Sequence, residues 1–316
     1  MNHNLESFFA RCLQGDIIAA MDILNNIYPK IEEMEELEQR FKNRFFSDEY
    51  EEEIRSEDPF IKSVIVAYHH YFRLVLINAK TIDEAEKELV EHLSNLLEND
   101  FNETMDEIEE RLLELFKEKG YHFLGGVTPP YRGPYIWKNM HKLQFEVELP
   151  LAKQAVTVHM MSDFLLEGWM SFATCEHKHV GGWANEEGLY CNAKVYPDLD
   201  EELFQVSYLK HEAQHLYDYM HFPNLQPKEL EYRAKLVELI YSKEHTLLKK
   251  FLTQAKDDPN FPHPYASYQI IKNLSSILFA KNVESDYNAW FTIDYNDISK
   301  AAYELFVQNT REMIDS

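Results

Sequence analysis

Hydrophobic residues recur with a helical period through the first third of the chain. From residue 5 to about residue 118, apolar positions return every three or four residues, which predicts one α-helix after another. The segment 60–77 is apolar on most faces, as expected of a buried central helix. Thr81 and Glu84 have the spacing of a capping box, so another helix is predicted to begin there. We therefore expect residues 1–118 to be nearly all helical.

The pattern changes near residue 120. Glycine and proline are concentrated in residues 120–135, and both residue types interrupt helices. Beyond them, residues 142–150 and 154–160 alternate apolar and polar positions, as half-buried strands do. Residues 186–197 are a third strand candidate, which ends at Pro197. A small sheet is therefore expected between about residues 143 and 197.

The helical period returns at about residue 201 and continues to the C-terminus. The clearest of these helices begins near Pro227, a residue type that suits the first turn of a helix. The order of elements predicts an α+β chain that is mostly helical. We expect a helical domain at residues 1–120 and a second domain, which holds the small sheet, at residues 121–316.

Composition and charge narrow the range of partners. The chain has 316 residues, of which 45% are hydrophobic, so it can bury a substantial core. Its net charge of −24, from 55 acidic and 31 basic residues, disfavours nucleic acid and anionic membranes as partners. We expect a cytoplasmic protein, because the N-terminus does not match a signal peptide and the three cysteines are too scattered for a disulfide framework.

The candidate chemistry lies in the segment 208–222. His211, Glu212 and His215 form the pattern H-E-x-x-H. Residues four apart share one face of a helix, so both imidazoles can point at the same metal ion. Glu212 lies about 100° round the helix, where it can take a proton from an attacking water, as in metalloproteases. The neighbouring positions are mostly uncharged, so we expect one helix from Val206 to Met220 with both histidines facing a partner helix.

This segment resembles the active-site helix of the zincin metallopeptidases. The resemblance covers residues 183–240, and it implies that residues 121–316 form a zincin-like domain in which a small sheet lies over the H-E-x-x-H helix. Residues 181–197 would then supply the edge strand along which a peptide substrate lies. The resemblance also implies a Zn²⁺ cofactor and a peptide or protein substrate.

A catalytic zinc site needs a third protein ligand. Glu231 follows on the next predicted helix, in the manner of the gluzincins. His221 matches the spacing of the metzincins, but Asp218 stands where those proteins have a glycine that turns the chain. Glu229 and Glu238 remain candidates for the same role. We predict His211, His215 and Glu231 as the metal ligands, with His221, Glu229 and Glu238 left open for the third position.

Two groups after the third-ligand helix are candidates for binding the substrate's oxygen. Gluzincins often place a hydrogen-bond donor in this part of the chain, and His263 and Tyr265 occupy it here. Asp218, three residues after His215, is a candidate acceptor for the second N–H of that histidine.

We therefore expect a hydrolase, a zinc metallopeptidase of gluzincin type, with Glu212, His263 and Tyr265 as its catalytic residues. The alternative is a non-catalytic, acidic helical interaction protein on a zincin fold, with structural zinc or none. Stoichiometric zinc with an open coordination position would distinguish the two.

Overall fold

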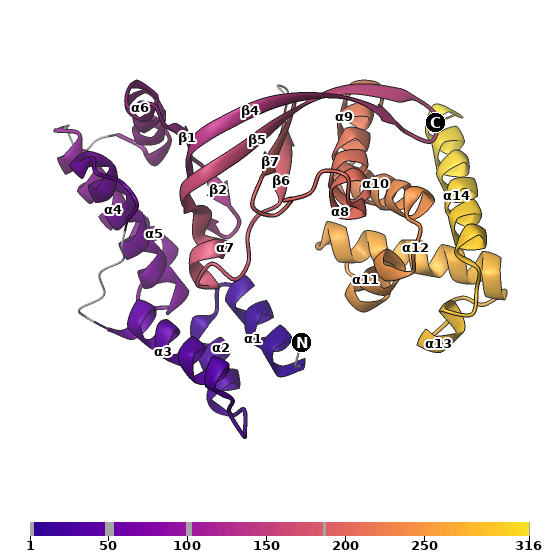
Figure 1. Ribbon diagram of the computed structural model, residues 1–316, viewed down its shortest axis with the longest axis horizontal. Coiled ribbons are helices and arrows are strands. Elements are labelled where there is room, and N and C mark those ends of the chain that lie inside the picture. The colour runs from indigo at the N-terminus through magenta and orange to yellow at the C-terminus, as the bar shows by residue number, and fades with distance from the viewer. Residues whose placement is uncertain (1–2, 48–53, 99–102, 186–187, 316) are drawn as a thin grey trace. The chain divides into compact units, whose positions relative to one another are not determined.

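Two units, each with its own hydrophobic core, make up the chain in a computed structural model that describes residues 3–47, 54–98, 103–185 and 188–315 (Figure 1). The first unit comprises Met1–Met140 and Met161–Val180, and the second comprises His141–Met160 and Gly181–Ser316. The chain is mixed α and β and mostly helical, as predicted.

Among the described residues of the first unit, six helices precede the sheet. They are α1 (His3–Leu13), α2 (Ile17–Asn25), α3 (Glu32–Phe46), α4 (Pro59–Leu76), α5 (Ile82–Leu96) and α6 (Met105–Glu118). The prediction of a nearly all-helical segment up to residue 118 is confirmed for the described residues.

Local signals explain where these helices begin. The Asp58 side chain caps α4 by accepting hydrogen bonds from two backbone N–H groups of its first turn, and Pro59 occupies the first helical position. The capping box predicted from Thr81 and Glu84 is present at α5. Helix α4 is largely buried, as its apolar composition predicted.

A five-stranded sheet has the strand order β1-β4-β5-β7-β6. Its strands are β1 (His122–Leu124), β4 (Tyr135–Glu148), β5 (Lys153–Glu167), β6 (Gly182–Asn185) and β7 (Gly188–Asn192). A separate two-stranded sheet pairs β2 (Val127–Thr128) with β3 (Tyr131–Arg132). In the second unit β6 and β7 are antiparallel, with Trp183 opposite Tyr190. A short helix, α7 (Gly168–Ala173), follows β5.

The sheet begins earlier than the sequence predicted. We expected strands only after about residue 143, but β1 starts at His122 and β4 at Tyr135. Tyr135, Ile136 and Trp137 are buried in succession, so the first part of β4 lacks the alternation that marks a half-buried strand. The third strand candidate appears as β7, whereas its first two residues, 186 and 187, lie outside the described part of the chain.

The division into units also differs from the boundary expected at residue 120. Strands β4 and β5 each contribute residues to both units, so the first unit extends to Met140 and takes in Met161–Val180. The glycine- and proline-rich segment that suggested a boundary contains the short strands β1 to β3 of the first unit.

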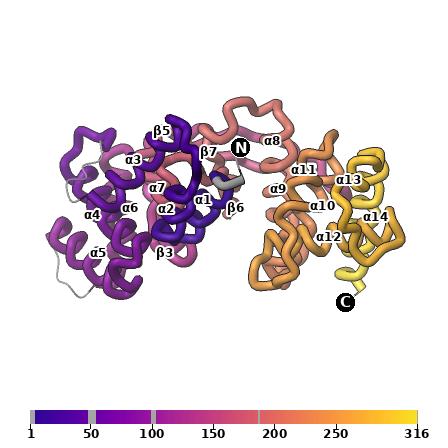
Figure 2. The backbone as a smooth tube through the Cα atoms, turned by 90° about the horizontal axis from the view of Figure 1, so that it is seen from below, coloured from indigo at the N-terminus to yellow at the C-terminus, as the bar shows by residue number. Residues whose placement is uncertain are grey.

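The second unit is built around helix α10 (Pro227–Tyr241). Its helical segments are α8 (Glu202–Phe204), η1 (Gln205–Lys210), α9 (His211–His221), α10 (Pro227–Tyr241), α11 (Thr246–Gln254), α12 (Pro262–Phe279), α13 (Tyr287–Trp290) and α14 (Tyr295–Asp315). Helix α10 packs against α9, α12 and α14 (Figure 2) and is buried along most of its length. Pro227 is its first residue, as predicted. None of the helices in the described ranges is long and apolar enough to cross a bilayer.

Candidate metal centre

The H-E-x-x-H motif lies at the start of α9, immediately after a segment of π-helix. The expected helix over residues 206–220 is continuous, but η1 has the wider i→i+5 pairing before α9 begins at His211. Such π segments are rare and occur often at functional sites. Tyr208 on η1 donates a hydrogen bond of 2.7 Å to the carbonyl of Tyr190, which anchors the segment to β7.

Three buried side chains bring their ligand atoms together. His211 Nε2 and His215 Nε2 are 3.1 Å apart. Glu231 on α10 places Oε1 at 3.3 Å from His215 Nε2 and Oε2 at 3.7 Å from His211 Nε2. Because all candidate ligand atoms lie within 4.8 Å of one another, this group could hold a metal ion.

The spacing of these atoms fits a tetrahedral ion. Zinc with bonds of about 2.0–2.2 Å holds its ligand atoms roughly 3.3–3.5 Å apart. The separations of 3.1, 3.3 and 3.7 Å lie around that value. Two facing imidazole nitrogens can share only one proton, whereas a cation between them would bind both lone pairs. Two imidazoles with one carboxylate are also a donor set that zinc accepts.

The buried carboxylate of Glu231 and the imidazole of His215 shift each other's pKa values. Burial alone would raise the pKa of Glu231, but the nearby imidazoles of His215, His263 and His211 hold it well below its usual range. Burial alone would lower the pKa of His215, yet the hydrogen bond to Glu231 and the surrounding carboxylates raise it. The centre therefore holds an ionised carboxylate out of solvent, where positive charge is favoured.

Glu238 lies behind His211 rather than in the ligand cluster. His211 Nδ1 is 2.7 Å from Glu238 Oε1, and the glutamate is buried. Burial would raise the pKa of Glu238, but the charge and hydrogen bond of His211 outweigh it and lower that pKa. The ionised carboxylate accepts a hydrogen bond from the Nδ1–H group of His211, which leaves the Nε2 lone pair directed at the cluster. Glu238, which the sequence left open as a third ligand, is thus a positioning residue.

His221 and Glu229, which the sequence also left open as third ligands, lie outside the cluster. His221 is exposed, with Nδ1 at 2.8 Å from the Tyr217 carbonyl and its ring stacked on that of Tyr217. Glu229 is exposed and accepts a hydrogen bond from the Gln226 backbone in the capping box of α10. The geometry therefore favours Glu231 as the third member of the group.

Glu212 is half-buried and follows His211 directly on α9. Burial would lower the pKa of His215, but Glu231 and the charge of Glu212 outweigh it and raise that pKa. Burial raises the pKa of Cys191 on β7 to about 12, and the charge of Glu212 adds to that shift against a hydrogen bond to Tyr208. Glu212 is therefore close enough to influence both the cluster and β7.

The two predicted donors have different positions. His263, at the start of α12, places Nδ1 at 2.6 Å from Glu231 Oε2 while its side chain stays 65% exposed. It therefore lies on the open side of the cluster. Tyr265 instead lines a cavity between α10, α12 and α14, and its ring centroid is 6.5 Å from that of Tyr268.

Tyr219 is a candidate that the sequence analysis did not identify. Its ring centroid is 6.4 Å from that of His215, and the side chain is exposed. Burial of part of the ring raises the pKa of Tyr219, and the charges of Glu212 and Glu231 add to the shift. The signal was present in the spacing, because Tyr219 follows His215 by four residues and shares its helix face.

Asp218 does not accept the second N–H of His215, contrary to the prediction. It is fully buried and accepts hydrogen bonds of 2.8 Å from both Gln214 Nε2 and Arg233 Nε. The guanidinium is the stronger partner because its charge compensates the buried carboxylate. His215 Nδ1 is buried and has no hydrogen-bond partner among the described residues.

Arg233 extends the same network to α14. Its NH1 group is 3.0 Å from Asn309 Oδ1 and 2.9 Å from Thr310 Oγ1. The guanidinium is almost completely buried and also lies over the ring of Phe306. Helices α9, α10 and α14 are thus joined by one buried charged network next to the candidate ligands.

A scan of protein-family models, a search of curated proteins and a search of solved structures each returned no match. The interpretation of the centre therefore depends on the geometry of this chain.

The Asp218–Arg233 pair gives a test of this packing. Arg233→Met leaves a buried carboxylate without its cation, so we expect the free energy of unfolding to fall by about 3–5 kcal/mol. The free energy of unfolding should fall less in the double variant Asp218→Asn/Arg233→Met than the losses of the single variants Asp218→Asn and Arg233→Met add up to. Urea unfolding followed by circular dichroism, with a chelator present, measures these values. The exposed control Arg311→Met should change stability by no more than about 0.5 kcal/mol, and additive losses in the double variant would contradict the pairing.

Proposed function

We propose that this chain is a zinc-dependent metallopeptidase of gluzincin type with a zincin-like second unit. The convergence of His211, His215 and Glu231 at ligand spacing carries the proposal. Three protein ligands on zinc are typical of catalytic sites, because they leave a position for water or substrate. Glu212 lies beside this group and completes the set of residues that peptide hydrolysis needs.

Each residue has a defined part in the proposed reaction. Zinc, when bound, would supply Lewis acidity for the attacking water and the scissile carbonyl. Glu212 accepts the proton of the attacking water and passes it to the leaving amine. His263 and Tyr219 lie on the exposed side of the centre, where an N–H or O–H can donate to the carbonyl oxygen as it becomes negative.

The neighbouring strands support a peptide substrate. Helix α9 packs against β6 and β7, and β6 is the last strand in the order of the sheet. An edge strand presents backbone N–H and C=O groups to which an extended peptide can pair. In the proposal the substrate lies along β6, beside the H-E-x-x-H helix.

Glu212→Gln separates catalysis from metal binding. Glu212 is not a ligand and the change is nearly isosteric, so zinc content should stay at the wild-type level. Hydrolysis should fall by a factor of about 10² to 10⁴, because proton transfer is lost. His215→Ala should lose both zinc and activity, and Glu304→Gln, an exposed control, should keep both. Zinc is measured by mass spectrometry after dialysis, and hydrolysis is measured on a broad peptide library.

Equal activity in the wild type and Glu212→Gln would refute the mechanism. Stoichiometric zinc without hydrolysis of any library peptide, together with reduced stability on zinc removal, would instead support a non-catalytic protein with structural zinc.

Glu238→Gln tests the positioning of His211. The neutral amide is a poorer acceptor for the Nδ1 proton, so we expect zinc affinity to fall by about 10- to 100-fold. Glu231→Gln removes a carboxylate ligand and should weaken zinc binding further. Competition with a chelating dye measures both affinities. If Glu238→Gln binds zinc as tightly as the wild type, the carboxylate does not orient His211.

A further inference from the structure

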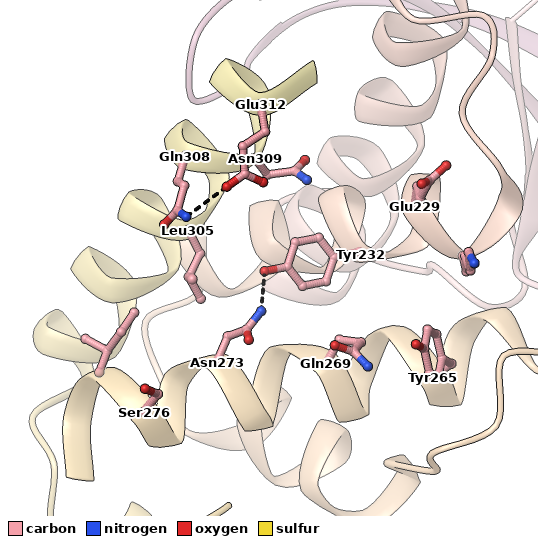
Figure 3. A pocket seen from close by; sticks show the side chains of 12 residues that line it. Glu229, Tyr232, Tyr265, Gln269, Asn273, Ser276, Leu305, Gln308, Asn309 and Glu312 are labelled. Atoms are coloured by element: carbon pink, nitrogen blue, oxygen red, sulfur yellow. Dashed lines mark hydrogen bonds between the residues drawn. The ribbon is translucent and has the colours of Figure 1, made fainter. Parts of the chain in front are cut away.

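A polar groove runs along α12 in the second unit (Figure 3). One cavity of about 470 Å³ lies between α10, α12 and α14. Its wall is rich in aromatic and amide side chains: Tyr232, Tyr265, Gln269, Asn273, Gln308 and Asn309. A second cavity of about 500 Å³ shares Asn273 and Ser276 with the first and reaches Asn282, beyond the end of α12. The two cavities thus share part of the wall that α12 provides, and they are treated together as one groove.

The spacing of side chains along α12 matches an extended peptide. Tyr265, Gln269, Asn273 and Ile277 line the groove at intervals of four residues. Four residues of helix rise about 6 Å. Peptide groups on one side of an extended chain repeat every two residues, at about 6.6–6.8 Å. Successive side chains of α12 can therefore meet successive peptide groups of a bound strand.

Amide side chains suit the chemistry of those peptide groups. A Gln or Asn side chain offers an N–H donor together with a C=O acceptor, which is the pair that a backbone peptide unit needs. The side chain of Gln269 forms no hydrogen bond with the described residues, so both its N–H and its C=O can serve a ligand. Asn273 Nδ2 donates to the Tyr232 hydroxyl at 2.9 Å, which holds this amide in the groove wall. A held side chain loses little entropy when a ligand binds.

Helix α10 contributes residues to both the groove and the candidate metal centre. Glu229 and Tyr232 line the cavity (Figure 3), whereas Glu231 belongs to the centre. Residues two apart on a helix lie on nearly opposite faces, so the cavity and the ligand cluster use different faces of α10.

The charge of the groove is nearly balanced. The lining of the two cavities contains Lys228, Lys272 and Lys281 together with Glu229 and Glu312, which gives a local net charge of 3 − 2 = +1. Hydrogen bonding to the peptide backbone, rather than charge, is therefore the basis on which the groove would select a ligand.

We propose that this groove is a binding site for an extended peptide segment, held by hydrogen bonds from Gln269 and Asn273 to its backbone. Its role as a substrate subsite rests on the proposed peptidase function, whereas the binding itself does not.

A binding experiment without turnover tests the subsite. Fluorescently labelled protein carrying Glu212→Gln, which leaves peptides intact, is applied to immobilised 12-residue peptides of random sequence and to an array of oligosaccharides. The peptides should be bound and the oligosaccharides should not. Gln269→Leu/Asn273→Leu, added to this protein, should weaken binding at least about tenfold, since each change removes hydrogen bonds to the backbone. The matched control Gln254→Leu/Asn288→Leu, at exposed sites outside the groove lining, should bind normally.

Each further outcome has a defined meaning. Gln269→Leu alone, at a half-buried site, should show a smaller loss with unchanged circular dichroism, which separates lost binding from misfolding. The subsite is refuted if the peptides remain bound to the double variant, if no peptide binds, or if an oligosaccharide array is bound instead. Peptide binding that depends on the two amides, in a wild type that hydrolyses nothing, would keep the subsite and refute the peptidase.

Discussion

The register between α9 and α10 is the constraint on which the candidate centre depends. Glu231 and Glu238 lie two turns apart on α10, and they face His215 and His211 on α9. Arg233, between them in sequence, pairs with Asp218 on the same partner helix. A shift of one residue along either helix would separate all three pairs and leave several charges buried without partners, which costs far more than a surface ion pair gains. These three buried pairs thus permit one register between α9 and α10, and that register brings the three candidate ligand groups together.

Other faces of the same two helices organise the surroundings. On one side, η1 is anchored to β7 by the hydrogen bond from Tyr208 to Tyr190. On another side, α10 and α12 enclose the polar groove. Helix α10 therefore contributes residues to both the candidate metal centre and the groove.

The parts that the sequence predicted are those that depend on local spacing. Capping residues and apolar period located the N-terminal helices, and the four-residue spacing of His211 and His215 placed both imidazoles on one helix face. Glu231 was predicted as a ligand from a resemblance, and its carboxylate lies near both imidazoles in the structure. Roles that depend on tertiary partners could not be predicted from the sequence. The neighbouring helices decide whether Glu238 is a ligand or a hydrogen-bond acceptor for His211 Nδ1, and whether Asp218 contacts His215 or Arg233. The early start of β4 was hidden because Tyr135, Ile136 and Trp137 are buried in succession.

Anomalous diffraction at the zinc absorption edge, from crystals of the wild-type protein grown with zinc, tests the central claim most directly. The account predicts one peak at about 2 Å from His211 Nε2, His215 Nε2 and a carboxylate oxygen of Glu231, with one further position open to solvent. It would be contradicted by zinc held by other residues, such as Glu238 or His221, or by the absence of zinc between the two imidazoles.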